Sequence, residues 1–168
     1  MRLLNVTAQV RLAEPADVPA LLMLMRELAS FEDYLQHFAV DESALLERAF
    51  GPQAQCQVFV AASVDGLCGY AVVLEIPFTY DLRPRVVLKE LYVAPQARGT
   101  GLGTSLLREV ARWSSSRGAG QLSWLVLKGN RRAETFYRRL GGVPDSKWIA
   151  YEMDGTRLAA LTEQAEQA

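Results

Sequence analysis

The stretch that most limits how this chain can fold is an apolar run that leads through a glycine-rich loop into a helix-forming segment. Residues 86–93 read VVLKELYV, residues 96–104 read QARGTGLGT, and SLLREVARW follows. The first run has the length and β-branched content of a strand. Leu106 and Val110 recur at helical spacing in the last segment. The chain therefore passes from strand to helix through a loop whose backbone is largely bare of side chains.

The glycines of this loop fit neither of two well-known nucleotide motifs. A P-loop requires a lysine after its last glycine, but Thr104 follows Gly103 here. A dinucleotide fingerprint requires a G-x-G-x-x-G spacing and an acid about 20 residues further on. This chain has G-x-G-x-G, and no acid stands between Glu109 and Glu134. What remains is an anion site at a helix N-terminus, with Arg98 as a charged fork for a phosphate, or a plain turn that uses glycine for positive φ.

The other segments place this unit within one mixed α/β domain. Strands are predicted over residues 9–12, 57–63, 69–80, 86–93, 121–127 and 148–154. Helices are predicted over residues 17–32, 41–50, 105–117, 130–140 and the tail 155–168, with Asp17 and Asp41 as N-caps of the first two. An Asp65-Gly66 pair indicates a hairpin between the second and third strands. With 168 residues, 50% of them hydrophobic, we expect a single domain over 1–168.

Composition excludes several classes of protein. The formal net charge of −1 does not indicate the basic face typical of nucleic-acid-binding proteins, and no stretch approaches the ~20 apolar residues that span a bilayer. The opening MRLLNVTAQVRL lacks the apolar centre of a signal peptide. Cys56 and Cys68 have no metal-ligand spacing, and we expect both to be reduced core residues. We therefore expect a cytoplasmic protein without a metal and without nucleic-acid or membrane partners.

The stretch LYVAPQARGTGLGTSLLREVARW resembles the signature of the GNAT acetyltransferase superfamily. A further strand LSWLVL, then Asn130, then TFYRRLG stand where that family has its second motif. RELASFE, PFTYD and ETFYRRLG resemble the diamine branch, the spermidine/spermine and thialysine type. The resemblance covers nearly the whole chain. It implies an α/β GNAT fold with one mixed, mostly antiparallel sheet of about six or seven strands, helices on both faces, and a homodimer.

The resemblance also implies acetyl-CoA as the cosubstrate, with its pyrophosphate held by the amides of the glycine loop. Val93 would contribute backbone hydrogen bonds, and the backbone near Leu91 would supply an oxyanion donor. Asn130 serves equally well as a helix N-cap. For at least two of the four arginines Arg131, Arg132, Arg138 and Arg139, a solvated basic helix face is favoured over contact with CoA phosphates. The residues implied for cofactor binding are Leu91, Val93, Arg98, Gly99, Thr100, Gly101, Leu102, Gly103, Thr104, Asn130 and Arg139.

Glu90 and Tyr137 are the candidate catalytic residues, because acetyl transfer removes a proton from an amine and returns one to a thiolate. Lys89 and Glu90 interrupt an apolar strand, and strict alternation would send their side chains to opposite faces. The resemblance gives Glu90 the deprotonation of the amine; the alternative is a salt bridge. Tyr137 lies on an apolar helix face, which alone indicates a core tyrosine, and the resemblance makes it the acid for the thiolate.

Glu32, Tyr80, Asp81 and Lys89 are the candidate substrate residues. Glu32 continues the apolar stripe of the first helix, where it either faces the amine pocket or ends the helix in solvent. The resemblance places Tyr80 and Asp81, from FTYD, near the same pocket.

The charges near this pocket bear on the choice of substrate. Diamine enzymes carry Glu-Asp where this chain has Lys89-Glu90, and Arg83 and Arg85 add two cations. These cations repel a polycation, so a lysine-like amino acid fits better than spermine among small primary amines. Acetylation of a protein or peptide amine, and a non-catalytic acyl-CoA-binding module, are the alternatives.

Overall fold

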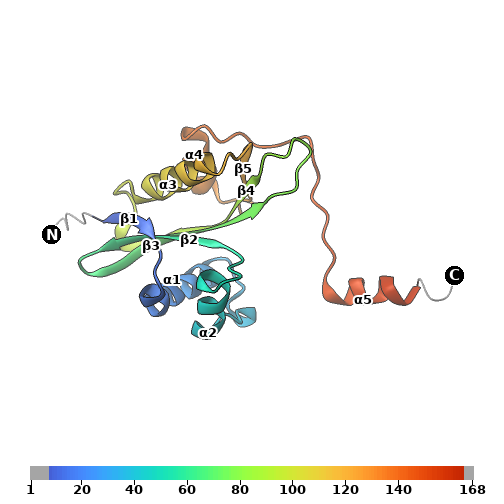
Figure 1. Ribbon diagram of the computed structural model, residues 1–168, viewed down its shortest axis with the longest axis horizontal. Helices are drawn as coiled ribbons and strands as arrows, with labels where there is room; N and C mark the ends of the chain where they lie inside the picture. The colour runs from blue at the N-terminus through green and yellow to red at the C-terminus, as the bar shows by residue number, and fades with distance from the viewer. Residues whose placement is uncertain (1–7, 165–168) are drawn as a thin grey trace. The chain divides into compact units, whose positions relative to one another are not determined.

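The structure, a computed structural model, describes residues 8–164 (Figure 1). The chain forms two compact units, one ending at Asn130 and the other beginning at Arg131, and each is described by itself. The expectation of a single domain over 1–168 stays a prediction. The expected end of the tail helix, 165–168, and the first seven residues of the opening segment lie outside the described residues.

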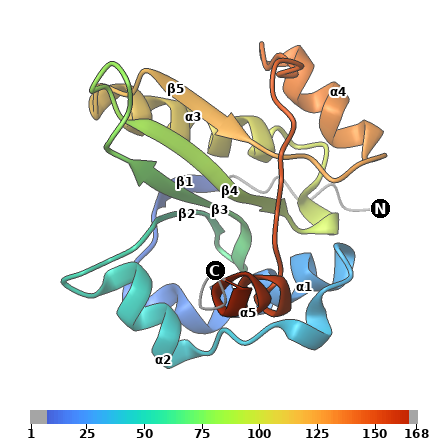
Figure 2. The same ribbon diagram turned by 90° about the vertical axis from the view of Figure 1, so that its right-hand side faces the viewer.

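A five-stranded sheet forms the centre of the first unit (Figures 1 and 2). Its strands lie side by side in chain order: β1 (Gln9–Leu12), β2 (Gln57–Ser63), β3 (Gly66–Ile76), β4 (Arg85–Val93) and β5 (Gln121–Trp124). Neighbouring strands are antiparallel except β4 and β5, which are parallel. The mixed, mostly antiparallel sheet is confirmed, with five strands in the described part instead of six or seven.

The predicted strand over residues 148–154 is wrong, because these residues have no regular secondary structure. A strand requires a neighbouring edge to pair its backbone N–H and C=O groups. The regular elements described in the second unit are two helices, α4 (Arg131–Arg139) and α5 (Gly155–Gln164), and helices offer no such edge. β3 also ends at Ile76, before the predicted residue 80, since Pro77 has no N–H to donate.

Helices cover both faces of the sheet, as predicted (Figure 1). α1 (Val18–Phe31) and α2 (Glu42–Leu45) lie on one face; α2 widens into a π-helical turn over Leu46–Phe50. α3 (Leu102–Ser116) lies on the other face. The core under α1 and α2 includes Tyr70, Val72 and Tyr92 from the sheet.

The two predicted N-caps have different outcomes. Asp41 caps α2, since its Oδ1 accepts a hydrogen bond from the N–H of Ala44 at 2.7 Å. Asp17 makes no side-chain cap to α1, because its own backbone is already helical (φ −78°, ψ −15°). Its carboxylate instead accepts the N–H of Glu14 at 2.8 Å and pairs with Arg11. Asp17 thus closes the short 3-10 turn, Pro15–Asp17, that precedes α1.

Two other expectations concern cysteines and membrane spans. Cys56 and Cys68 are both free thiols; Cys68 is buried and Cys56 is half-buried against the core under α1. Across residues 8–164 no helix has the length and apolar character needed to cross a membrane.

Candidate active site

The loop between β4 and α3 presents its backbone N–H groups at the start of a helix. Gly99 and Gly101 have φ of +79° and +88°, a conformation that side chains with a Cβ rarely adopt. Apart from the glycine itself and its two chain neighbours, a Cβ at either position would meet no atom within 4 Å, so local backbone conformation and not crowding requires glycine. The first backbone bond of the helix runs from the Ser105 N–H to the Gly101 carbonyl at 3.0 Å. Within residues 8–164 the N–H groups of 102–104 therefore have no carbonyl acceptor, and they lie at the positive end of the helix dipole.

Arg98 connects this loop to the end of β4. Its Nε–H donates to the Val93 carbonyl at 2.8 Å, and its guanidinium carbon lies 5.6 Å from the centroid of the Tyr92 ring. The Tyr92 hydroxyl donates to Oε2 of Glu27 in α1 at 2.8 Å. Thr100 adds a bond within the loop from its hydroxyl to a carbonyl, at 2.6 Å. The loop conformation is thus held from β4 and, through Tyr92, from α1.

An extra residue in β4 puts Glu90 on the α1 side of the sheet. Glu90 pairs with Val72 while Leu88 pairs with Val73, so Lys89 has no counterpart in β3. Paired residues share a face, and Val72 belongs to the core under α1. Leu88 therefore faces α3 and Glu90 faces α1, although both positions are even-numbered. The bulge thus interrupts the strict alternation expected along this strand between Leu88 and Glu90.

Glu90 accepts a hydrogen bond from a buried tyrosine on the neighbouring strand. The hydroxyl of Tyr70, in β3, donates to Oε2 of Glu90 at 2.8 Å. The Tyr70 side chain is fully buried, with 0% relative exposure. This burial, and after it the charge and hydrogen bond of Glu90, raise the pKa of Tyr70. The phenol therefore stays protonated and remains a donor.

The charge of Glu90 contributes to the raised pKa of three further groups. Glu32 ends α1, and desolvation followed by the Glu90 charge raises its pKa, while Lys89 opposes the shift. Desolvation, with Glu90 and Glu32 adding to it, raises the pKa of Tyr34 to about 12. Desolvation and then Glu90 raise the pKa of the Cys56 thiol. Glu32 and Lys89 are exposed side chains, and the charges of Lys89 and Glu90 both act on Glu32.

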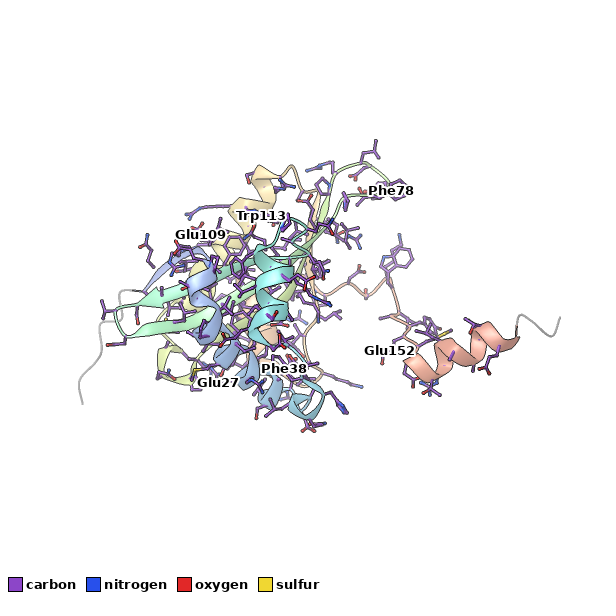
Figure 3. All side chains as sticks on the ribbon, turned by 60° about the horizontal axis from the view of Figure 1, so that its bottom comes forward. Glu27, Phe38, Phe78, Glu109, Trp113 and Glu152 are labelled. Atoms are coloured by element: carbon purple, nitrogen blue, oxygen red, sulfur yellow. The ribbon has the colours of Figure 1, made fainter. Side chains whose placement is uncertain are left out.

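Tyr80 and Asp81 lie elsewhere, on the loop between β3 and β4. The Asp81 carboxylate accepts the Arg83 N–H at 3.2 Å and the Thr79 hydroxyl at 3.0 Å, and the Arg83 bond is the main cause that lowers the pKa of Asp81. β4 begins after this loop, and residue 90 lies about 16 Å from residue 85 along a strand that rises ~3.3 Å per residue. Figure 3 labels Phe78, which lies on the same loop as Tyr80 and Asp81. Within the first unit Tyr80 and Asp81 are not brought to Glu90.

The remaining predicted residues lie on or next to the second unit. Tyr137, on α4, is half-buried, and its ring meets Phe136 edge-on with centroids 5.1 Å apart. Arg139 is the exposed last residue of α4. Asn130 ends the first unit, where its N–H donates to the Leu127 carbonyl at 2.9 Å. The roles expected of these three residues stay predictions.

Sequence reasoning did not identify Tyr70, Tyr34 or Cys56 as site residues. Tyr70 carried one usable signal: a tyrosine inside a continuous apolar strand must find a partner for its hydroxyl. That the partner is Glu90 depends on the bulge in β4, which no local sequence pattern predicts. Among residues 8–164 no group of three or more His, Cys, Asp or Glu side chains is arranged to hold a metal ion.

Several known acetyltransferases are similar to this chain. The model of the acetyltransferase (GNAT) family matches residues 22–142. A thialysine N-epsilon-acetyltransferase of Mus musculus is 29% identical over 166 residues, which cover 92% of this chain and 97% of the relative. An L-ornithine N5-acetyltransferase of Arabidopsis thaliana is 22% identical in an alignment 199 positions long, which covers 92% of this chain and 87% of the relative.

One solved structure extends the comparison to the fold. An integron cassette protein from the mobile metagenome of V. cholerae aligns with a TM-score of 0.79 at 21% identity, over 95% of this chain and 99% of that chain. At that identity the likeness shows the fold alone. Because the family match spans most of the chain, from α1 through α4, the protein belongs to the GNAT family of acetyltransferases.

Proposed function

We propose that this protein transfers the acetyl group of acetyl-CoA to the side-chain amine of a free, lysine-like amino acid. Acetyl-CoA is the cosubstrate of GNAT acetyltransferases, and the relatives support an N-acetyltransferase. The observation that carries the proposal is the position of Glu90. A bulge turns this carboxylate toward α1, and its strand leads directly to a loop with open N–H groups.

The glycine loop fits the pyrophosphate of acetyl-CoA. The N–H groups of residues 102–104 have no acceptor in the described part of the chain, and a helix N-terminus attracts phosphate. Beyond the neighbouring residues in the chain, no atom lies within 4 Å of a Cβ built at Gly99 or Gly101, so the backbone is open to a ligand there. Arg98 binds the Val93 carbonyl through its Nε, and that bond leaves its terminal nitrogens available to donate to a phosphate.

The reaction is a direct attack of the amine on the thioester. Glu90 takes a proton from the substrate ammonium, directly or through a water molecule. The freed amine nitrogen bonds to the thioester carbon, and the carbon–sulfur bond breaks. The leaving thiolate takes a proton from the hydroxyl of Tyr137. The nitrogen, positively charged once it has bonded to the carbon, loses its second proton to solvent as the amide forms. Solvent returns a proton to Tyr137, and Glu90 releases its own proton. The assignment of Tyr137 rests on the resemblance of TFYRRLG to the family's second motif.

Charge around Glu90 favours an amino acid over a polyamine. Glu32 and Glu90 attract an ammonium group, whereas Lys89 attracts a carboxylate and repels a second ammonium. A substrate with both an amine and a carboxylate uses all three. The mouse and Arabidopsis relatives are named for thialysine and L-ornithine, which both have this character.

The test is a thiol-release assay of the full chain with acetyl-CoA over a panel of amines. The panel contains thialysine, lysine, ornithine, spermidine, spermine, an aminoglycoside and a lysine-containing peptide. We expect the highest kcat/KM for one of the three amino acids. A preference for spermine contradicts the substrate assignment, and a preference for the peptide favours a protein acetyltransferase. Tight acetyl-CoA binding without CoA release over the whole panel favours a non-catalytic acyl-CoA-binding module.

We also propose that the chain acts as a cytoplasmic homodimer with one acetyltransferase domain over 1–168. The support is the resemblance to the diamine branch, whose members are commonly dimers. Sedimentation equilibrium of the full chain tests the oligomeric state: a mass of twice 18.6 kDa supports the proposal, and a mass of 18.6 kDa contradicts it.

A further inference from the structure

We infer that Tyr70 positions the Glu90 carboxylate, holding Oε2 so that Oε1 is the atom that receives the amine proton. This inference rests on the proposed role of Glu90 as the base. Tyr70 does not touch the reacting atoms in this account. It acts through Glu90 and is a positioning residue.

The geometry across the two strands carries the inference. Tyr70 pairs directly with Tyr92, and its hydroxyl reaches back along β4 to Oε2 of Glu90 at 2.8 Å. Glu90 reaches this face only through the bulge at Lys89. Within residues 8–164 no donor is directed at Oε1 of Glu90. The carboxylate therefore has one oxygen held by the protein and one available to a substrate.

Burial makes Tyr70 a rigid anchor. Its side chain has 0% exposure and its ring lies against that of Tyr92, with centroids 6.2 Å apart. A packed ring of this kind keeps one rotamer, whereas a glutamate has three rotatable side-chain bonds. A fixed donor therefore restricts a flexible base to one orientation, which lowers the entropy lost on reaching the transition state.

Tyr70 differs from the other titratable or charged groups around Glu90 in being hydrogen-bonded to it. Glu32 and Tyr34 approach from the end of α1 and the residues after it, Cys56 from the segment before β2, and Lys89 from β4 itself. None of these four side chains is hydrogen-bonded to the Glu90 carboxylate in the described part of the chain, whereas the Tyr70 hydroxyl is. The raised pKa of Tyr70 keeps it a donor throughout the range in which an acetyltransferase is assayed.

The first test is Tyr70→Phe in the full chain, assayed with the best amine of the panel. Phenylalanine keeps the ring and removes only the hydroxyl. A carboxylate that loses a hydrogen-bond donor is protonated more readily. We expect kcat to fall about tenfold. In the plot of kcat/KM against pH, the acid limb, where activity falls as pH decreases, should move up by about one pH unit. The KM for acetyl-CoA stays within about twofold of wild type.

Tyr92→Phe is the matched control. It removes a phenol hydroxyl from the paired position, at the same 2.8 Å distance from a carboxylate, but that carboxylate is Glu27. The acidic side of its kcat/KM pH profile should stay where wild type has it. A change in its KM for acetyl-CoA would report on the glycine loop, which Tyr92 helps to hold, and not on Glu90. A merely structural effect of losing a tyrosine hydroxyl would appear in both variants.

Site-specific 3-fluorotyrosine at position 70 covers the case in which Tyr70→Phe does not fold. Fluorine is nearly isosteric with hydrogen and makes the phenol a stronger donor, so the acid limb should move the other way, to lower pH. An unmoved limb in this protein overturns the inference. So does a folded Tyr70→Phe protein whose limb and kcat match wild type, or whose kcat falls with no shift of the limb.

Glu90→Gln separates this inference from the proposed function. If Glu90→Gln keeps wild-type turnover, the role of Glu90 as base is wrong and the inference fails with it. If Glu90→Gln is inactive while both changes at Tyr70 leave the profile unmoved, the base assignment stands and only the role of Tyr70 is wrong.

Discussion

Arg98 lies over the ring of Tyr92, with its guanidinium carbon 5.6 Å from the ring centroid. The same side chain donates from Nε to the carbonyl at the end of β4, at 2.8 Å. A guanidinium expected to bind phosphate therefore also orients the loop that supplies the amides. A planar guanidinium can stack on a ring and still donate in a second direction, whereas a lysine ammonium has the charge but neither the stacking plane nor the second direction of donation.

Arg98→Lys should weaken acetyl-CoA binding nearly as much as Arg98→Ala, about tenfold or more, because both lose the Val93 bond and the stack on Tyr92. Titration calorimetry with CoA measures both affinities. Arg108→Lys, an exposed change on α3, is the control and should bind normally. Wild-type affinity in Arg98→Lys would show that charge alone matters at this position.

Gly101→Ala should destabilise the fold by about 1–2 kcal/mol, because its φ of +88° places a Cβ close to the following carbonyl. Gly155→Ala is the matched control: a Cβ there also meets open space, but no positive φ opposes it. Urea unfolding followed by circular dichroism compares the two midpoints. Equal midpoints for both variants would contradict the assignment of strain to Gly101.

Glu90→Gln should lower kcat by about 10²–10⁴-fold, the range that a general base supplies. Glutamine is nearly isosteric and can still accept the Tyr70 bond, so the fold should be unchanged. Glu75→Gln, on β3, is the control and should keep wild-type turnover, since Glu75 is engaged by Arg117 at 2.7 Å. Steady-state CoA release measures both, and a Glu90→Gln enzyme within threefold of wild type would remove Glu90 from the mechanism.

Tyr137→Phe should lose about 10²–10⁴-fold in turnover while it keeps acetyl-CoA affinity, since only the proton donor for the thiolate is removed. Tyr151→Phe, in the same unit of the chain, is the control and should be active. Turnover and CoA affinity are measured side by side. A near-wild-type rate for Tyr137→Phe would make it the core tyrosine that its helix face alone indicates.

Asp17→Asn should lower the free energy of unfolding by about 1 kcal/mol at pH 7, because Arg11 contacts the carboxylate through two nitrogens, at 2.7 and 2.9 Å. The Arg11 hydrogen bond is the main cause that lowers the pKa of Asp17 below its usual value of 3.8. The stabilisation is therefore fully present above about that value and is lost as pH falls through the lower, folded-state pKa. Denaturant unfolding from pH 7 to pH 3 should show that the curves of wild type and of Asp17→Asn converge only at the acid end. A constant difference would contradict this ionic contribution.

Patterns between residues close in sequence predicted their elements well. The strand over 57–63 has the predicted bounds, the hairpin closes at Gly66, and Asp41 caps α2. Each depends on neighbours within a few residues. Two predictions were wrong because they depend on contacts outside the local sequence. The Asp17 side chain pairs with Arg11 instead of capping α1, and a strand over 148–154 would require an edge from another part of the chain.

Local sequence patterns were enough to predict the strand, the glycine turn and the helix, because positive φ and hydrophobic periodicity are properties of residues close in the chain. It also marked Glu90 as a charge out of place in an apolar strand. The face on which Glu90 lies and the group that binds it depend on the pairing of β4 with β3, which local patterns do not contain. One extra residue in β4 reverses the side on which every later side chain lies, and the pairing with β3 then puts Tyr70 within 2.8 Å of Glu90.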